Sequence, residues 1–353
     1  MTSLFEKTLN GTVTSPPPLW LMRQAGRYLK EYKAVRSSEP DFISFCLNPK
    51  KAVEVTLQPI EKFDFDAAII FSDILMVPWA LNRNVRFEPG KGPLMTPLEA
   101  TSQILNSDMD SLQTKLAPVG AAISGCRAAL SPDKSLIGFA GAPWTVITYM
   151  LEGQSSRDFA RSRTWLWDNG GEFEALLELV TEATINFLEL QARAGANALM
   201  IFDSWAGAVP SEFRTQVVIN PIRKIIEELR RRGCHQPVIG FPKGIGEGLI
   251  AYCDEAGIQG VGLDHGCDVT WAAANLPKHI VVQGNLDPLS LISGGAKMEV
   301  AIANIREAFH DRAHIFNLGH GITPETPVQN VHHLINLIRD SGDRDNSGAG
   351  TDV

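Results

Sequence analysis

Two arginines lie four residues apart in the stretch WLMRQAGRY, which covers residues 20–28. On a helical turn, the guanidinium groups of Arg23 and Arg27 would lie on one face. Gly26, between them, lets the backbone bend and lets a ligand approach closely. Two planar guanidiniums on one face can bind carboxylates or phosphates, each through two hydrogen bonds. The alternative is a pair of surface arginines, or arginines tied to carboxylates of the protein itself.

Further polar side chains each follow a separate short apolar run of the sequence. Asp73 ends the run AAIIFSD, where a carboxylate either accepts hydrogen bonds from a ligand or caps the helix that follows. His320 is flanked by two glycines, which give it little of the packing that a buried histidine would need. Ser204 ends another run, and Tyr149 stands behind a third. If the fold brings the ends of these runs together, the four side chains lie in one pocket.

The apolar runs repeat along the chain. Eight are present, at residues 18–24, 67–73, 135–141, 198–204, 237–243, 258–264, 279–285 and 314–320. Segments with helical spacing of apolar residues lie between several of them, at residues 48–63, 173–195, 221–233 and 296–311. Continuous apolar strands that alternate with amphipathic helices are typical of a parallel sheet covered by helices. The eight units predict an α/β fold, a single-domain (β/α)8 TIM barrel over residues 1–340.

In such a barrel the strand ends converge at one face, where the active site is built. Long segments follow the second and third runs: residues 81–97 predict a hairpin, and residues 148–165 a long loop. An open doubly wound sheet is the alternative fold. It would carry a G-x-G-x-x-G or G-x-x-x-x-G-K-[ST] motif, and neither occurs in the sequence. The glycines of KGIGEG, residues 243–248, have a different spacing and predict only a tight loop.

The composition limits the partners and the compartment. The 353 residues carry a formal net charge of -8, so neither a nucleic-acid nor an anionic membrane surface is expected as a partner. The five cysteines are scattered and never spaced C-x-x-C, which indicates a reducing cytosol rather than a disulfide framework. No apolar run approaches the ~20 residues of a membrane span, and the start shows no targeting pattern. We therefore expect a soluble cytoplasmic protein, with the start of the chain and residues 341–353 disordered.

A metal site and a hydrolase site are other chemistries that the sequence could support. His265 and Cys267, in the stretch DHGCD, form an H-x-C pair that can supply two zinc ligands. A third ligand would have to come from Cys253 or His320, and no spacing supports either. A G-x-S-x-G elbow is absent, so Ser204 is not expected to be a hydrolase nucleophile. Neither a metal site nor a hydrolase triad is therefore predicted.

The motifs at the strand ends resemble those of the uroporphyrinogen decarboxylase family of haem biosynthesis. The matching stretches are LMRQAGRYLKEY, FSDIL, GAPWTVITYMLEG, FDSWAG, QGNLDP and NLGHGI, and the resemblance runs over nearly the whole chain. It implies a cofactor-free (β/α)8 barrel, a homodimer and a small-molecule tetrapyrrole substrate. It also implies the reaction of the family, in which the four acetate side chains of uroporphyrinogen III become methyls, giving coproporphyrinogen III and four CO2.

The resemblance further implies roles for individual residues. The substrate-binding residues would be Arg23, Gln24, Ala25, Gly26, Arg27, Asp73, Tyr149, Ser204 and His320. Asp73 corresponds to the central aspartate of the family, which contacts the pyrrole N–H groups, and Arg23 and Arg27 would act with it in catalysis. The substrate carries eight carboxylates, whereas the chain is acidic overall. We therefore expect the two arginines, with His320 and Lys243, to form a local positive surface.

Two other functions stay open at this point. Corrinoid-dependent methyltransferases of the same barrel superfamily bind zinc through a His-x-Cys pair at the end of the fifth strand, where this chain reads VIGFPKG. A tetrapyrrole-binding barrel without catalytic activity would use the same arginines for affinity. Incubation with the substrate distinguishes these two functions from a decarboxylase.

Overall fold

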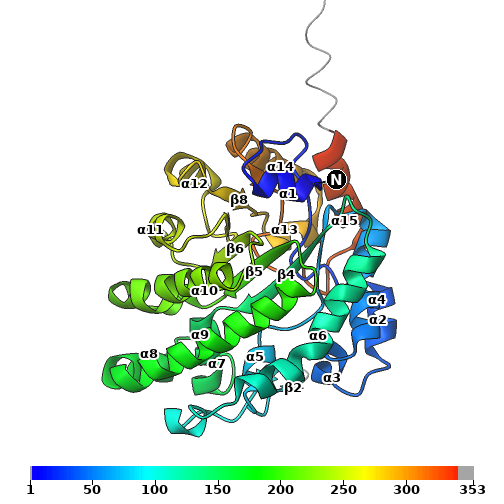
Figure 1. Ribbon diagram of the computed structural model, residues 1–353. Helices are drawn as coiled ribbons and strands as arrows, with labels where there is room; N and C mark the ends of the chain where they lie inside the picture. Colours follow the sequence, from blue (N-terminus) through cyan, green and yellow to red (C-terminus); the bar gives the residue numbers. More distant parts are fainter. Residues whose placement is uncertain (1, 89, 341–353) are drawn as a thin grey trace, which may run out of the picture.

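Apolar strands form the centre of the protein. The computed structural model describes residues 2–88 and 90–340, so the tail at 341–353, predicted to be disordered, lies outside the described residues. Seven parallel strands in the order β1-β4-β5-β6-β7-β8-β9 form a curled sheet, and helices cover its outer side (Figure 1). Their bounds are β1 (Ala67–Ile69), β4 (Ser135–Gly141), β5 (Ala198–Asp203), β6 (Val238–Pro242), β7 (Gly260–Gly262), β8 (Val281–Gln283) and β9 (His314–Ile315). Seven of the eight predicted strands are thus confirmed.

The prediction of a strand at residues 18–24 is wrong. Leu19 forms only a single parallel bridge, to Phe316 just after β9. The backbone nevertheless bonds in both directions: the N–H of Phe316 donates to the Pro18 oxygen and the N–H of Asp66 donates to the Leu19 oxygen, both at 2.9 Å. The prolines before Leu19 offer no N–H, and a turn follows directly, so too little chain is left for a ladder.

The predicted helices form with nearly the expected bounds. Four predicted segments are confirmed, as α4 (Pro49–Phe63), α9 (Gly170–Arg193), α10 (Asn220–Arg231) and α14 (Gly295–Ala308). In α4 the Asn48 side chain accepts from the N–H of Lys51 and proline occupies the first turn, which are both signals that start a helix. None of the helices in the described ranges is long and apolar enough to span a membrane.

The other helices are mostly short and connect strands to the long helices. They are α2 (Lys30–Arg36), α3 (Phe42–Cys46), α5 (Met76–Ala80), α6 (Met109–Ala129), α7 (Pro143–Glu152), α8 (Ala160–Asp168), α11 (Gly248–Glu255), α12 (Val269–Asn275), α13 (Pro288–Ser293) and α15 (Val328–Arg339). Single turns of other helix types are η1 (Thr101–Gln103), η2 (Ala206–Ala208), η3 (Ser211–Phe213) and the π-helix η4 (Thr215–Ile219).

The predicted hairpin after β1 is confirmed. β2 (Arg86–Glu88) pairs antiparallel with β3 (Gly92–Leu94). Phe87 of β2 packs against Phe42 with ring centroids 4.5 Å apart, and Phe42 packs edge-on against Phe71. Because Phe71 lies just beyond β1, this aromatic row ties the hairpin to the end of the strand where the first candidate carboxylate follows.

The start of the chain is helical, which corrects the prediction of a disordered end. Helix α1 (Leu4–Leu9) begins with a capping box, in which Ser3 and Glu6 satisfy each other's backbone N–H groups. Phe5 is fully buried, and the Ser3 hydroxyl lies 2.6 Å from that of Ser135 at the start of β4. Burial of one aromatic ring outweighs the polar composition of this segment.

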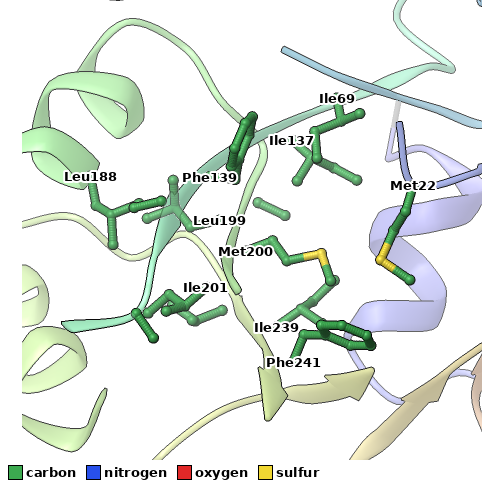
Figure 2. Close-up of a cluster of buried hydrophobic side chains, with 14 of the residues drawn as sticks. Met22, Ile69, Ile137, Phe139, Leu188, Leu199, Met200, Ile201, Ile239 and Phe241 are labelled. Carbon is green, nitrogen blue, oxygen red and sulfur yellow. The ribbon is translucent and has the colours of Figure 1, made fainter. Parts of the chain in front are cut away.

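Large apolar side chains of alternate residues in β4, β5 and β6 fill much of the inner face of the sheet. Figure 2 shows Phe139 and Met200 in the interior, with Met22 of the first apolar run on the opposite side. Phe139 and Met200 are direct neighbours across β4 and β5. Leu199 points the other way, toward Leu188 of α9 (Figure 2). The interior is therefore packed with apolar side chains, and the candidate site must lie where the strands end.

Candidate active site at the strand ends

The loop that carries the arginines begins with a strained turn. The N–H of Gln24 donates to the Leu21 oxygen (3.0 Å), which closes a turn over residues 21–24. Arg23 is the third residue of this turn and has φ 62°, in the left-handed region where glycine is favoured. A side chain in this region costs about 1 kcal/mol of backbone energy. The presence of arginine at a position suited to glycine points to a role for its guanidinium.

Arg23 projects, exposed, among the polar side chains of the strand ends. Its side chain passes over Gly321, where an added Cβ would lie only 2.7 Å from Arg23 Cγ. Burial is the main cause of the shifted pKa values of Asp73, Tyr149 and His320, and the Arg23 charge acts to lower all three. Within the described residues, its guanidinium forms neither a hydrogen bond nor an ion pair with the protein. It is free to bind an anion.

Arg27 does not share a helical turn with Arg23, so that prediction is wrong. Helix α2 begins only at Lys30, and the left-handed residue at position 23 turns the chain before it. Arg27 is exposed, and its charge acts on the pKa of Tyr32 instead, which burial raises to about 12. The two guanidiniums therefore do not share one face of a helix. Ala25, between them, is half-buried and packs against the core.

Gln24 and Gly26 hold the loop in place. The Gln24 side chain is fully buried: its Oε1 accepts from the N–H of Leu21, and its Nε2 donates to a backbone oxygen of β1, both at 3.1 Å. With both ends bonded to backbone, the Gln24 side chain anchors the loop and is not free to contact a ligand. A Cβ on Gly26 would lie 2.8 Å from the Arg23 oxygen. The close approach that requires glycine here is thus made by the loop itself.

Asp73 follows β1, and its carboxylate closes a turn while leaving one oxygen free. Its Oδ1 accepts from the N–H of Leu75 at 2.8 Å, two residues on, in the turn that leads into α5. Its Oδ2 has no hydrogen-bond partner in the part of the chain that the structure describes. The side chain is half-buried. Burial raises its pKa to about 6, although the Leu75 N–H and the Arg23 charge lower it.

Tyr149 of α7 meets an aromatic residue that the sequence analysis missed. Tyr149 is nearly buried, and its ring centroid lies 6.2 Å from that of Trp205, just after β5. Burial raises the pKa of Tyr149, and the nearby Trp205 indole lowers it in part. The Nζ of Lys243 lies 5.8 Å from the Trp205 ring, at the range of a cation–π contact. Ser204, beside Trp205, is half-buried. An aromatic residue directly after a strand end, in FDSW, was the signal for this cluster.

His320 is neutral near pH 7, which corrects the expectation that it adds positive charge. Its Nδ1 accepts from the N–H of Gly321 at 2.7 Å, so the proton of the neutral ring is on Nε2. Burial, together with the charges of Arg23 and Lys243, lowers its pKa to about 4. His320 can therefore donate one hydrogen bond to a ligand, whereas Arg23 and Lys243 supply the positive charge.

The loop that carries His265 and Cys267 is organised by a carboxylate. Asp264 accepts from two backbone N–H groups, of its own loop and of the loop after β6, at 2.8 Å each. His265 is exposed, and burial raises the pKa of the Cys267 thiol to about 11, which disfavours the thiolate that binds zinc. Across residues 2–88 and 90–340, no group of three His, Cys, Asp or Glu side chains could hold a metal ion.

The structure thus brings one subset of the candidate residues together. The charge of Arg23 lowers the pKa values of Asp73, Tyr149 and His320. The charge of Lys243, just after β6, also lowers the pKa of His320. This group combines a carboxylate of raised pKa, two cations without carboxylate partners in the described residues, and neutral hydrogen-bond donors. Such a set suits an anionic ligand that also carries donor groups or develops positive charge.

Comparisons with known proteins match this arrangement to one family. The sequence model of Uroporphyrinogen decarboxylase (URO-D) matches residues 2–341. A uroporphyrinogen decarboxylase of Rhodospirillum rubrum is 47% identical over 335 residues, covering 95% of this chain and 96% of that protein. One of Sphingopyxis alaskensis is 46% identical over 333 residues, covering 94% and 96%. A solved methyltransferase from Methanosarcina mazei shares the fold, with a TM-score of 0.75 at 17% identity over 97% of this chain and 99% of that one. This chain belongs to the uroporphyrinogen decarboxylase family.

Proposed function

We propose that this protein removes CO2 from the four acetate side chains of uroporphyrinogen III and so forms coproporphyrinogen III without a cofactor. One observation carries the proposal: Asp73, half-buried and with a free Oδ2, lies within electrostatic reach of the exposed guanidinium of Arg23. Such a pair suits a ligand with carboxylates at its edge and N–H groups at its centre. Family membership supports the same substrate.

The reaction needs an acceptor for the electron pair that CO2 leaves behind. Protonation of an electron-rich pyrrole gives a cationic ring, which takes up the pair when the C–C bond breaks, so that no external electron sink is needed. The exocyclic methylene that remains then takes up a second proton and becomes the methyl, and the ring releases the proton that it gained first. The Asp73 carboxylate, placed at the ring N–H groups, stabilises this cation more than it stabilises the neutral substrate. Losing a preorganised electrostatic partner of this kind typically costs ~3 to 4 kcal/mol of transition-state stabilisation.

Binding of the substrate carboxylates falls to the cations of the mouth. Arg23 and Lys243 have no carboxylate partner in the described residues, and His320 offers its Nε2–H as a neutral donor. Tyr149 and Ser204 add hydroxyl groups, and Arg27 binds a carboxylate from the outer part of its loop. Because the pKa of arginine exceeds ~12, its guanidinium is a poor acid. A substrate carboxylate or a water held by the arginines therefore relays the proton.

We also propose how the barrel closes and how the protein assembles. Residues 18–22 take the eighth strand position and close a (β/α)8 barrel that spans residues 1–340 as one domain. The backbone hydrogen bonds of Pro18 and Leu19 to both sides support this closure. Two copies associate as a homodimer in the cytoplasm, as the family resemblance implies. The free state of all five cysteines supports a reducing compartment.

A zinc- or corrinoid-dependent methyltransferase is the second candidate, since a methyltransferase shares the fold. That likeness, at 17% identity, concerns the fold alone. β6 and the residues after it, VIGFPKG, offer neither His nor Cys as a ligand. A tetrapyrrole-binding barrel without turnover would have the same mouth and is distinguished by its products.

Anaerobic incubation with uroporphyrinogen III tests the proposal directly. The products are oxidised to porphyrins and separated by the number of carboxylates that they carry. We expect porphyrins with seven, six, five and finally four carboxylates to appear in sequence. Tight binding without any product would identify a binding barrel. Stoichiometric zinc, with loss of function in Cys267→Ala, would identify a methyltransferase.

The pH dependence of turnover gives a second check on Asp73. Its pKa is raised to about 6, so the carboxylate is protonated below that pH and cannot stabilise a cation. We expect kcat/KM to fall about tenfold per pH unit below pH ~6. His320 titrates lower, at about 4, and is neutral throughout this range. Rates measured from about pH 5 to about pH 8 should show this limb in the wild type; a limb of the same position in Asp73→Asn would exclude Asp73 as its source.

A further inference from the structure

Asp203 is a buried carboxylate that the proposed reaction does not use. It ends β5 and is 1% exposed. Met200, on the same strand, points into the interior (Figure 2), so Asp203, three residues later, points outward toward the covering helices. Thr145 of α7 donates its hydroxyl to Asp203 Oδ1 at 2.5 Å. In the described residues neither Asp203 Oδ2 nor the buried hydroxyl of Tyr252, which the Asp203 charge influences, has a hydrogen-bond partner.

The buried carboxyl group of Asp203 lowers the stability of the folded protein. Burial raises the pKa of Asp203 to about 7, and the Thr145 hydroxyl offsets only part of that rise. A buried carboxyl group with one unpaired oxygen destabilises the folded protein relative to an apolar side chain of similar size. Packing alone would favour an apolar residue at this position, so its role must lie in what it bonds.

Thr145 connects Asp203 to the backbone of Trp205. The Thr145 hydroxyl accepts from the N–H of Trp205 at 3.1 Å while it donates to Asp203. A hydroxyl has only one proton to donate, so the carboxylate fixes its orientation and leaves its lone pair for Trp205. The Nε1–H of Trp144 donates to the Trp205 oxygen at 2.9 Å. Both backbone polar groups of Trp205 are therefore held by side chains of α7.

The Trp205 ring is the part of this unit that lies in the candidate site. Its centroid is 6.2 Å from Tyr149, 4.9 Å from Phe159 and 5.8 Å from the Nζ of Lys243. A shift of the Trp205 backbone would move the ring that lies beside both Tyr149 and Lys243. Displacement of about 1 Å at such positions is enough to change rates strongly.

We propose that Asp203 and Thr145 form a positioning pair, which fixes Trp205 so that its ring holds Tyr149 and Lys243 against the substrate. The inference rests on the decarboxylation site proposed above. Neither Asp203 nor Thr145 touches the reacting atoms. The pair acts through the backbone of one residue, so its loss should affect turnover without removing any group that binds the substrate.

Thr145→Val tests the pair, because it removes the hydroxyl at nearly constant volume. We expect kcat/KM to fall about 10- to 100-fold. Thr145→Ser should restore it to within about 3-fold, because serine keeps the hydroxyl. The matched control is Thr148→Val, one turn further along α7, where a buried hydroxyl donates to the Thr145 oxygen at 2.7 Å. This control should retain activity within about 3-fold. Equal losses in Thr145→Val and Thr148→Val would overturn the proposal.

The carboxylate is tested by two substitutions. Asp203→Asn keeps an acceptor oxygen and should retain kcat/KM within about 3-fold. Asp203→Leu removes the acceptor and should lose as much as Thr145→Val. Full activity in Asp203→Leu, with the protein folded by circular dichroism, would contradict the assignment.

A double-mutant cycle shows whether the effect passes through Trp205. In a Trp205→Ala background, Thr145→Val should lower kcat/KM by less than about 3-fold, because the ring that it displaces is gone. Additive effects would refute the coupling. Acrylamide quenching provides a readout that needs no turnover: Thr145→Val should raise quenching of the Trp205 emission, taken as the difference from Trp205→Phe, at least about twofold. Unchanged quenching in Thr145→Val would refute the positioning pair. Increased quenching in Thr145→Val, if the wild type shows no turnover, would support the positioning pair and refute the proposed function.

Discussion

Asp73→Asn should lower kcat by about 10² to 10³ while the protein still folds and binds uroporphyrinogen. The amide keeps the oxygen that accepts from the N–H of Leu75 at 2.8 Å, so the turn before α5 is preserved. What disappears is the negative charge beside the developing pyrrole cation. Single-turnover rates, with binding measured separately, would show a loss confined to the chemical step.

A matched variant separates the charge from the hydrogen bond. Asp108, at the start of α6, makes the same kind of hydrogen bond, with its Oδ1 accepting from the N–H two residues on, that of Asp110, at 3.0 Å, but it is exposed and outside the strand ends. Asp108→Asn should therefore leave kcat within about 3-fold of the wild type. If Asp73→Asn were as active as Asp108→Asn, the role given to Asp73 would have to be abandoned.

The same Asp73→Asn change should make the protein more stable at neutral pH. The folded pKa of Asp73 lies above its ordinary value of 3.8, at about 6, so its contribution to stability is full below pH 3.8 and lost as the pH rises through 6. The ionised carboxylate lowers the free energy of unfolding by on the order of 1 to 3 kcal/mol. The effect lies toward the lower end of this range, because the side chain is partly exposed. Denaturant unfolding near pH 7.5 should show a gain of this size, which disappears toward pH 4.

Arg23→Gln should lower kcat/KM by about 10- to 100-fold, chiefly through KM, because a hydrogen bond to a charged group contributes about 1.5 to 3 kcal/mol. The substitution should also move the acid limb of the rate to higher pH. Burial raises the pKa of Asp73 and the Arg23 charge lowers it, so removal of that charge leaves the raising effect less opposed. Steady-state rates across the acid range would measure both effects in one variant.

Two further variants show whether position or mere charge matters. Gly321→Ala would place a Cβ 2.7 Å from Arg23 Cγ and so displace the side chain while keeping its charge. We expect it to raise KM in the same direction as Arg23→Gln. Arg27→Gln removes an exposed charge that is not among the causes of the shifted pKa of Asp73, and it should have the smaller effect. A larger loss in Arg27→Gln than in Arg23→Gln would reverse the assignment of the main carboxylate contact.

The strands and long helices could be predicted because their signals are local. Seven apolar runs became strands and four periodic segments became helices. A strand buried on both faces gives a continuous apolar run, and a helix buried on one face gives apolar residues at helical spacing. The run at residues 18–24 failed because the prolines before it and the turn within it removed backbone donors that hydropathy does not register. The helix at Leu4–Leu9 was missed because its order depends on the burial of Phe5 and Leu9 against the rest of the fold, which a short segment does not reveal.

The residues of the site were easier to predict than their states. Asp73 and His320 could be found as polar residues at strand ends, since parallel strands end at one face. That His320 is neutral depends on burial and on Arg23 and Lys243, which lie far from it in sequence. The structural role of Gln24 depends in the same way on β1, because its Nε2 donates a hydrogen bond to a backbone oxygen of that strand. Spacing along a chain does not report such contacts.

The segment before Arg23 depends on residues that are synthesised long after it. The N–H of Met22 donates to Asn317 Oδ1 at 2.9 Å, the N–H of Ile322 donates to the Met22 oxygen at 2.8 Å, and the indole of Trp20 donates to Gln283 at 3.0 Å. On the ribosome, the loop emerges before these partners and cannot form its hydrogen bonds with them until the chain has been synthesised as far as Ile322. A nascent or prematurely terminated chain can therefore not hold Arg23 in place, and competence to bind the polyanion arrives only with the last strands.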